Sequence, residues 1–418
     1  MKGLRLFLPP FAPDTAGAAS VLYPLGGLVV IVDAGGCAGN ICGFDEPRFK
    51  RNSPIPAGKV TSASSKPNSG PVGVFPRKFL NPKDLLFPTR DKRPLSAKAL
   101  RGCLSRECPD RPASTQKLRE SVFTSAALRD MDAILGRDQH LIAHITSAVE
   151  DYQSAGRTFP FIALVGTPVP AVIGTDLQAL ARMIEQKHGI PTIAIDTDGT
   201  ESYDIGIEKT YAALFHHLAR IPSGITPRPG TVGVLGATTL DFGSDATAAL
   251  HHALRTKWKQ LCLYGLSSDP AHYIDAAQNE RNLVIAPSGL RAAQWLQTTF
   301  GTPYDIADPL AEQTFQHLNL PKTAKNILIL HQQITANALR TLLQPRYPDA
   351  LITCATWFRQ IGAITKPQDL RLREESDLPA VVKKNNYDLI LGDPLYKRAL
   401  PSYHGMWIPI HHPAISGF

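Results

Sequence analysis

The sequence predicts an α/β protein built from three domains with mostly parallel sheets. Three observations lead to this fold class. The chain has 418 residues, which is too long for one ordinary hydrophobic core. Short apolar runs rich in β-branched residues recur along it, and amphipathic helical patterns alternate with those runs. Repeated alternation of strands and helices is typical of parallel sheets that carry helices on both faces.

The first group of strands is expected at residues 28–32, 161–165 and 193–195. The run at 28–32 is apolar throughout, as expected for a strand covered on both faces. Between the last two strands the sequence predicts a helix that Thr175 caps and that Gly189 and Pro191 end. Its apolar positions share one face, and they are Leu177, Leu180, Ala181 and Ile184. These segments form a strand, helix, strand unit.

The same alternation returns twice further along the chain. Strands are expected at 231–235, 261–264 and 283–286, and again at 326–330, 351–354 and 387–391. Helices are expected to begin near Ser244, Ser268 and Ser288, and to cover 335–343 and 376–384. We therefore expect three Rossmann-like domains at residues 1–225, 226–322 and 323–418.

A basic, proline-rich segment interrupts the first domain at about residues 47–120. It holds 17 Lys and Arg against 5 Asp and Glu, and 11 of the 35 prolines. No helical or strand periodicity runs through it, so a solvated irregular insertion is the favoured interpretation. A docking arm for an acidic partner or for nucleic acid is the less favoured alternative.

Composition also bears on the compartment. The chain is 43% apolar and 19% charged, and its six cysteines are too few for a disulfide scaffold of this size, which favours a reducing environment. The amino-terminal stretch does not have the pattern of a signal peptide. The longest apolar run, at about 21–32, contains a proline and two glycines and is too short to span a bilayer. We expect a cytoplasmic protein that does not associate with membranes.

A glycine-rich stretch with two cysteines follows the predicted strand at 28–32. It contains Gly36, Cys37, Cys42 and Asp45, and ligands of parallel sheets bind beyond the carboxyl ends of strands. The glycines allow a tight turn near a bulky inorganic group, and the thiolates could ligate iron. A metal or iron–sulfur site, a disulfide and a plain tight turn with small buried residues all stay open on spacing alone.

Other candidates for chemistry are weaker. Cys103 and Cys108 repeat the same spacing inside the basic segment, whereas Cys262 and Cys354 lie in predicted strands and are interpreted as core residues. The pairs His216–His217 and His251–His252 are each expected to have one buried and one exposed member. The third pair, His411–His412, lies in a carboxyl-terminal loop that could approach a cleft.

Several catalytic signatures are absent from the sequence. It contains no P-loop motif, so the chain is not expected to hydrolyse nucleotide by that route. The glycines of residues 230–236 fall within and just after a predicted strand, which argues against a dinucleotide fingerprint. No serine-hydrolase elbow or H-E-x-x-H motif is evident.

The order of features resembles the component 1 subunits of nitrogenase and nitrogenase-like oxidoreductases. Three stretches carry the resemblance: Gly17 and Ala18 before the strand that leads to Gly36 and Cys37, the run at residues 121–138, and the run at residues 166–176. It covers most of the chain outside the basic segment, and it implies three Rossmann-like domains.

The resemblance also implies a function. Such a subunit receives low-potential electrons from a P-loop ATPase iron–sulfur reductase, through an iron–sulfur cluster shared between two identical or related subunits, and reduces a substrate. Cys37 and Cys42 are then the expected ligands of a 4Fe–4S cluster, with Gly36 beside it and Asp45 as an oxygen ligand in reserve. The need for a separate ATPase agrees with the missing P-loop.

The sequence departs from the family pattern at three places. Phe11 and Pro168 stand where the family has its first and third cysteines, and Asp33 stands where it has a histidine. Since a cluster needs about four ligands, two thiolates per chain would require a second subunit to supply the others. The alternative is a non-catalytic scaffold or binding subunit for a metal cofactor or small molecule.

Overall fold

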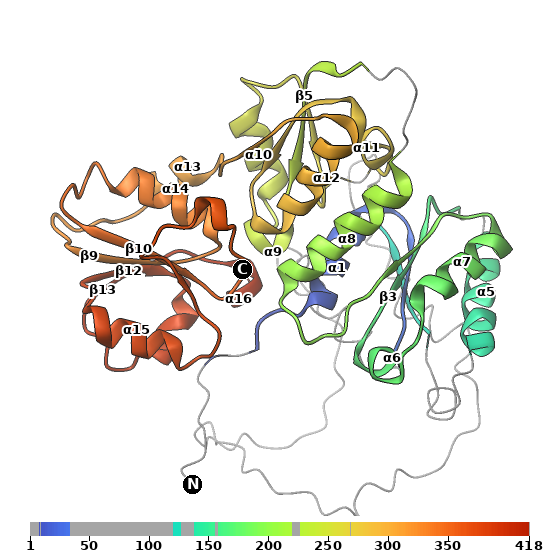
Figure 1. Ribbon diagram of the computed structural model, residues 1–418, viewed down its shortest axis with the longest axis horizontal. Helices are drawn as coiled ribbons and strands as arrows, with labels where there is room; N and C mark the ends of the chain where they lie inside the picture. The colour runs from blue at the N-terminus through green and yellow to red at the C-terminus, as the bar shows by residue number, and fades with distance from the viewer. Residues whose placement is uncertain are drawn as a thin grey trace, which may run out of the picture. The chain divides into compact units, whose positions relative to one another are not determined.

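The computed structural model describes residue 8 and residues 10–33, 120–126, 138–154, 158–219, 226–267 and 269–417. These residues all belong to one compact unit. Their strands form three sheets in which every strand pair is parallel. Figure 1 shows strands of these sheets with helices packed beside them. The predicted α/β class with three mostly parallel sheets is therefore confirmed.

The first sheet has the strand order β2-β1-β3-β4. Its strands are β2 (Val122–Ser125), β1 (Leu28–Ile31), β3 (Ile162–Val165) and β4 (Thr192–Ile195). Every residue of β1, β3 and β4 is buried, because helices cover both faces of the sheet.

Alternate side chains of β1 enter different cores. Val29 and Ile31 belong to the core that also contains residues of α1 (Asp14–Leu22) and α8 (Tyr203–Leu218). Leu28 and Val30 belong to the core formed with α5 (Asp138–Ser154) and α7 (Leu177–His188). The short helix α6 (Pro168–Ile173) follows β3 directly, and the 3-10 turn η1 (Tyr23–Leu25) follows α1.

The second sheet has the order β6-β5-β7-β8. Its strands are β5 (Arg228–Leu235), β6 (Gln260–Leu263), β7 (Asn279–Val284) and β8 (Tyr304–Ile306). Its helices are α9 (Thr239–Phe242), α10 (Ala246–Leu254), α11 (Ala271–Ile274), α12 (Leu290–Phe300) and α13 (Ala311–Gln316), with the 3-10 turns η3 (Ala276–Gln278) and η4 (Pro287–Gly289).

The third sheet has the order β11-β10-β9-β12-β13. Its strands are β9 (Asn326–Leu330), β10 (Leu351–Thr356), β11 (Leu370–Arg371), β12 (Leu389–Gly392) and β13 (Met406–Pro409). Its helices are α14 (Gln333–Leu343), α15 (Asp377–Asn385) and α16 (Pro413–Ser416), with the 3-10 turns η5 (Gly362–Ile364) and η6 (Pro394–Ala399). The β9, β10 and β12 side chains alternate between two cores in the same way as those of β1.

Two glycines let α1 and α8 pack with their backbones in direct contact. A Cβ atom at Gly17 would lie 1.9 Å from the carbonyl oxygen of Tyr203, and one at Gly206 would lie 1.8 Å from the carbonyl oxygen of Asp14. No side chain fits into either gap, so glycine is required at both positions. The amino-terminal end of α8 is thereby fixed against the helix that precedes β1.

Helix α7 has the buried face and the end that the sequence predicts, but a different capping residue. Its four expected apolar positions are buried, and Gly189 ends it in the left-handed conformation at φ 65°. The cap is Asp176 and not Thr175, because the Asp176 carboxylate accepts the Ala179 N–H at 2.8 Å. An aspartate one position closer to the helix outcompetes the threonine.

Other expectations have mixed outcomes. Strands β2, β8, β11 and β13 were not predicted, because they are short or carry few apolar residues. The prediction that each of two histidine pairs has one buried member is wrong, because both members of each pair are exposed: His216, His217, His251 and His252. The three domain ranges stay a prediction, and most of the basic segment lies outside the described residues. No helix among those residues is long and apolar enough to span a membrane.

Candidate functional site

The predicted cluster loop begins at the carboxyl edge of the first sheet. Gly36, Cys37, Cys42 and Asp45 lie outside the described residues, but the chain leading to them is described as far as Asp33. Asp33 is fully buried, and its carboxylate accepts a hydrogen bond from the Ser125 hydroxyl at the end of β2. The Thr167 hydroxyl after β3 donates to the Val32 carbonyl oxygen at 2.7 Å. Side chains from two neighbouring strand ends therefore hold the base of the loop.

The two positions where cysteines are missing have other roles in the structure. The Phe11 ring lies among aromatic rings, with its centroid 5.7 Å from that of Trp357, 5.9 Å from Phe358 and 6.2 Å from Tyr396. Pro168 begins α6 and is exposed, in the helical position that suits proline. Neither side chain carries a ligand atom, so these two positions supply no ligand to a cluster.

The described cysteines are core residues, as predicted. Cys262 in β6 and Cys354 in β10 are buried, and burial raises the pKa of their thiols to about 11 and about 12. Within the described ranges no group of three or more His, Cys, Asp and Glu residues is arranged to hold a metal ion.

A second candidate site lies where strand ends of all three sheets meet. It comprises Tyr203 after β4, Asp241 after β5, His331 after β9, Asp393 after β12 and His412 after β13. All of these side chains are buried, and we call this set the strand-end cluster. Carboxyl ends of parallel strands are where ligands of α/β proteins bind.

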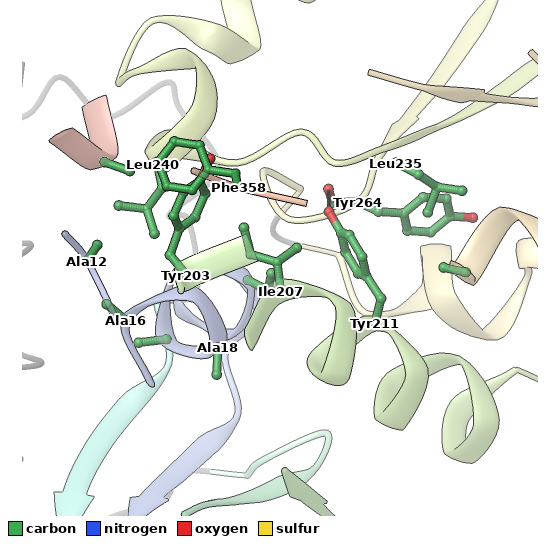
Figure 2. Packing of buried hydrophobic residues seen from close by; sticks show 14 of the residues in the cluster. Ala12, Ala16, Ala18, Tyr203, Ile207, Tyr211, Leu235, Leu240, Tyr264 and Phe358 are labelled. Atoms are coloured by element: carbon green, nitrogen blue, oxygen red, sulfur yellow. Dashed lines mark hydrogen bonds between the residues drawn. The ribbon is translucent and has the colours of Figure 1, made fainter. Parts of the chain in front are cut away.

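The Tyr203 hydroxyl connects two members of the strand-end cluster. It donates to Oδ1 of Asp241 at 2.7 Å and lies 3.2 Å from Nε2 of His412. The Thr238 hydroxyl donates to the other oxygen of Asp241 at 2.9 Å. Figure 2 shows Tyr203 directed toward Phe358 and Leu240, which shield this end of α8.

The two histidines lie against each other and against an aromatic ring. The His412 ring centroid is 4.7 Å from that of His331 and 5.0 Å from that of Phe358. The backbone N–H of His412 donates to Asp393 at 2.9 Å, and the ring nitrogen Nε2 of His331 lies 3.4 Å from the His411 carbonyl oxygen. The loop position expected for the third histidine pair therefore brings one member, His412, into a buried site.

Two ring nitrogens of this cluster, Nδ1 of His331 and Nδ1 of His412, are buried without a hydrogen-bond partner among the described residues. The hydroxyl oxygen of Ser288, after β7, is unpaired in the same sense. Ser288 belongs to η4, which packs against α8. Tyr273 and Asn282, elsewhere in the fold, also have an unpaired side-chain atom. Since buried polar groups are nearly always paired, the two neighbouring imidazole nitrogens make the strand-end cluster a candidate site.

Burial shifts the acid–base properties of the cluster. It raises the pKa of Asp241 to about 7 and the pKa of Tyr203 well above 10. It lowers the pKa of His331 to about 4 and that of His412 well below 6.5. At neutral pH both imidazoles are therefore neutral, and Asp241 exists in both of its protonation states.

Acidic residues of α8 link the three sheets just outside the cluster. The Glu208 carboxylate lies 2.9 Å from Nε of Arg359, which follows β10, and 3.4 Å from Nη1 of Arg291 in α12. Asp204 accepts the backbone N–H of Arg359 at 2.6 Å. One turn of α8 thus makes polar contacts with both other sheets.

A separate cavity of about 160 Å³ lies at the opposite edge of the second sheet. Its lining includes Thr231, Gln260 and Asn279, which stand near the amino ends of β5, β6 and β7. It contains none of the residues of the strand-end cluster. Because ligands of such sheets bind at the other edge, we give this cavity no catalytic role.

Sequence reasoning singled out only one residue of the strand-end cluster. Tyr203, Asp241, His331 and Asp393 carry no motif and are far apart in the chain, and His412 was noted only as part of a pair. A usable signal was present, since His331 and Asp393 each come directly after a buried strand. Which of these strand ends meet depends on how the three sheets pack.

The fold and the site together define a class of protein. It is a three-sheet parallel α/β protein in which strand ends of every sheet contribute to one buried polar cluster. The family of nitrogenase component 1 type oxidoreductases matches residues 100–311. The chain belongs to this family.

Individual relatives agree with that assignment. The chain is 26% identical over 269 residues to the nitrogenase iron–molybdenum cofactor biosynthesis protein NifE of Sinorhizobium fredii (strain NBRC 101917 / NGR234), an alignment that covers 62% of this chain and 52% of that protein. The chain thus spans about half the length of this curated relative.

Two solved structures share the fold. Nitrogenase Cp1 at pH 6.5 has a TM-score of 0.60 and 11% identity, covering 100% of this chain and 88% of the other. Nitrogenase Cp1 at pH 5 has a TM-score of 0.60 and 12% identity, covering 99% and 85%.

Proposed function

We propose that this protein is a subunit of a nitrogenase-like oxidoreductase that takes low-potential electrons from a separate ATP-dependent iron–sulfur reductase. Cys37 and Cys42 hold an iron–sulfur cluster together with ligands of a second subunit. Gly36 lies beside the cluster, and Asp45 is an alternative oxygen ligand. Such a cluster supplies one-electron transfer. The observation that carries the proposal is the origin of the loop at the buried, side-chain-braced carboxyl edge of the first sheet, in a chain of this family.

An apolar surface next to this edge supports a second subunit. Helix α6 follows β3, the neighbour of β1, and it exposes Pro168, Ala171, Val172 and Ile173. Val172 is 86% exposed and Ile173 is 42% exposed. Exposed large apolar side chains grouped in this way are typical of contact surfaces, which supports contact with a second subunit on this side of the first sheet.

The second candidate function is a scaffold or binding subunit that holds a metal cofactor or small molecule without turnover. Two observations favour it: Phe11 and Pro168 offer no ligand atoms, and one relative is named as a cofactor biosynthesis protein. On this alternative the buried strand-end cluster lines the holding site, because the unpaired ring nitrogens of His331 and His412 could contact a bound group.

Iron analysis tests the cluster proposal. Anaerobically reconstituted wild-type protein should bind iron and sulfide and show the absorption and paramagnetic resonance of a cluster, whereas Cys37→Ser and Cys42→Ser should lose most of the iron. Cys262→Ala is the matched control, because that thiol is buried in β6 and should not affect iron content. Wild-type protein without iron, or iron unaffected by Cys37→Ser, would refute the proposal.

Turnover separates the two candidate functions. Reductant- and ATP-dependent product formation with the reductase partner would exclude the scaffold, and stable association without turnover would favour it. Val172→Asp should weaken association with the second subunit while the fold stays intact, because the side chain is mostly exposed. Analytical ultracentrifugation of wild-type and variant protein measures this effect.

A further inference from the structure

Three buried side chains from three parts of the fold form a continuous hydrogen-bonded chain. Asp241 comes from α9, Tyr203 from the first residue of α8, and His412 from the segment before α16. The distances are 2.7 Å from the Tyr203 hydroxyl to Asp241 and 3.2 Å from the same hydroxyl to Nε2 of His412. Asp241 is 5% exposed and the other two are fully buried, so bulk water does not separate them.

The tyrosine hydroxyl is the decisive element of this chain. It has one proton and a partner on each side, so it can donate to only one of them at a time. When it donates to an ionised Asp241, its oxygen is free to accept from Nε2 of His412. When Asp241 is neutral and donates to it, the hydroxyl donates to Nε2, and the proton of the neutral imidazole must be on Nδ1.

We propose that Asp241, Tyr203 and His412 form an internal proton relay in which the direction of donation, and with it the tautomer of His412, reverses with the protonation state of Asp241. The neutral acid fixes the Nδ1–H tautomer of His412. The ionised acid fixes the Nε2–H tautomer.

The relay conserves protons and moves no electrons. The O–H bond of Asp241 breaks as an O–H bond forms on Tyr203, and the former O–H bond of Tyr203 breaks as an N–H bond forms at Nε2 of His412. The Nδ1–H bond then breaks, and its proton passes to a basic atom of a reduced substrate. Asp241 is left as a carboxylate, and His412 stays neutral.

The surroundings suit this role. Burial, together with the carboxylates of Asp204 and Asp308, raises the pKa of Asp241 to about 7, so both states are populated near neutral pH. Tyr396 faces Tyr203, His331 faces His412, and Asp393 lies near His331 and accepts the backbone N–H of His412. Because burial keeps His412 from holding a second proton, it exchanges one proton for another and does not store charge.

The unpaired Nδ1 of His412 is the end of the chain from which a proton can leave. It is buried and has no hydrogen-bond partner within the part of the chain that the structure describes, so it can donate to a molecule that occupies the site. The use of the relay in catalysis rests on the proposed reductive function, since reductions that add electrons to a substrate also require protons. The relay itself can be tested on the isolated protein without any partner.

Nitrogen NMR of the full chain with ¹⁵N-labelled histidine tests the relay. From about pH 5 to about pH 9, wild-type His412 should change from the Nδ1–H to the Nε2–H tautomer, with the midpoint of the Asp241 titration. Infrared difference spectra should show loss of a protonated carboxylic acid with the same midpoint. Tyr203→Phe should abolish the tautomer change, and Asp241→Asn should abolish both signals.

Tyr211→Phe is the matched control. Tyr211 is a buried tyrosine on the same helix, and its hydroxyl donates to the Tyr264 carbonyl oxygen at 2.6 Å, so its loss should leave the His412 tautomer change intact. A His412 tautomer that does not follow Asp241, or a change that survives in Tyr203→Phe, would overturn the relay. Iron binding and turnover do not enter this test, so it can fail or succeed independently of the proposed function.

Discussion

The carboxyl edge of the first sheet and the strand-end cluster differ in how the chain builds them. At the edge, Asp33 follows β1 and bonds to Ser125 at the end of the neighbouring strand β2, and the expected ligands come shortly after β1 in the sequence. The strand-end cluster instead draws single residues from segments after β4, β5, β9, β12 and β13. The first region is defined by a local motif, and the second exists only once the three sheets are packed.

The two regions should differ in which amino-acid substitutions they tolerate. A loop at an edge can change its residues while the strand ends below it stay in place, as the side-chain bonds to Asp33 and Val32 suggest. A buried cluster made of single contributions depends on helix packing, because no member is held by its sequence neighbours alone. Substitutions in the two regions should therefore have different effects on stability and on iron binding.

Gly17→Ala should disrupt the structure most. The added methyl group would lie 1.9 Å from the Tyr203 carbonyl oxygen, so α1 and α8 must separate at a cost of about 5 kcal/mol or loss of folding. Gly362→Ala is the control, because nothing lies within 4 Å of its Cβ position. Denaturant unfolding measures both variants, and equal stabilities would contradict the packing described here.

Asp241→Asn should change how stability depends on pH. The pKa of Asp241 is raised to about 7 from an ordinary 3.8, so its contribution is fully present below about pH 4 and is lost as pH rises through about 7. Relative to wild type, the variant should gain about 4 kcal/mol between these pH values, at about 1.4 kcal/mol per unit.

His331 supplies an internal check on that experiment. Its pKa is lowered to about 4 from 6.5, so its contribution is present above about pH 6.5 and is lost as pH falls through 4. In wild type this trend opposes that of Asp241 over the shared range, and in Asp241→Asn stability should rise clearly with pH. If the free energy of unfolding depended on pH in the same way in both proteins, Asp241 would not be a protonated carboxylic acid in the folded state.

Phe11→Cys should behave as a packing defect and not as a restored ligand. The ring contacts Trp357, Phe358 and Tyr396, and its truncation should cost about 2 kcal/mol. Iron content after reconstitution should equal that of wild type. A rise in bound iron without loss of stability would place position 11 at the iron–sulfur cluster and away from Trp357, Phe358 and Tyr396.

Arg291→Ala should have the smallest effect, within about 0.5 kcal/mol, because the arginine is 72% exposed and its pair with Glu208 is screened by water. Arg359→Ala should cost somewhat more, because this side chain is 40% exposed and lies closer to Glu208. Unfolding at low and high salt measures both, and a large effect for Arg291 would contradict the ranking.

Local patterns predicted the parts of the fold that depend on neighbouring residues. The apolar runs at β1, β3 and β9 and the amphipathic face of α7 were readable because burial on one or both faces imposes a period on the sequence. Strand β8, with only Tyr304 to Ile306, was not predicted, because three residues show no period. The observed cap is one residue after the predicted cap, because two residues that can cap a helix, Thr175 and Asp176, are adjacent in the sequence.

The two candidate sites were predictable to different degrees, because one is a local sequence motif and the other depends on contacts between distant segments. Cys37 and Cys42 stand out by their spacing after a strand, so the edge could be found without any tertiary contact. The Tyr203 to Asp241 and Tyr203 to His412 contacts join segments far apart in the chain, and only the packing of α8 brings them together. His216 and His251 were misjudged because helix periodicity alone does not say which face is buried.

The contact between Gly17 and Gly206 also has a consequence for synthesis on the ribosome. Helix α1 is made early, yet the helix that buries it, α8, is translated only after all four strands of the first sheet. Until then α1 lacks its main helical neighbour, and contacts of such long sequence separation form slowly. The nascent amino-terminal segment is therefore the part of this protein that we expect to need a chaperone.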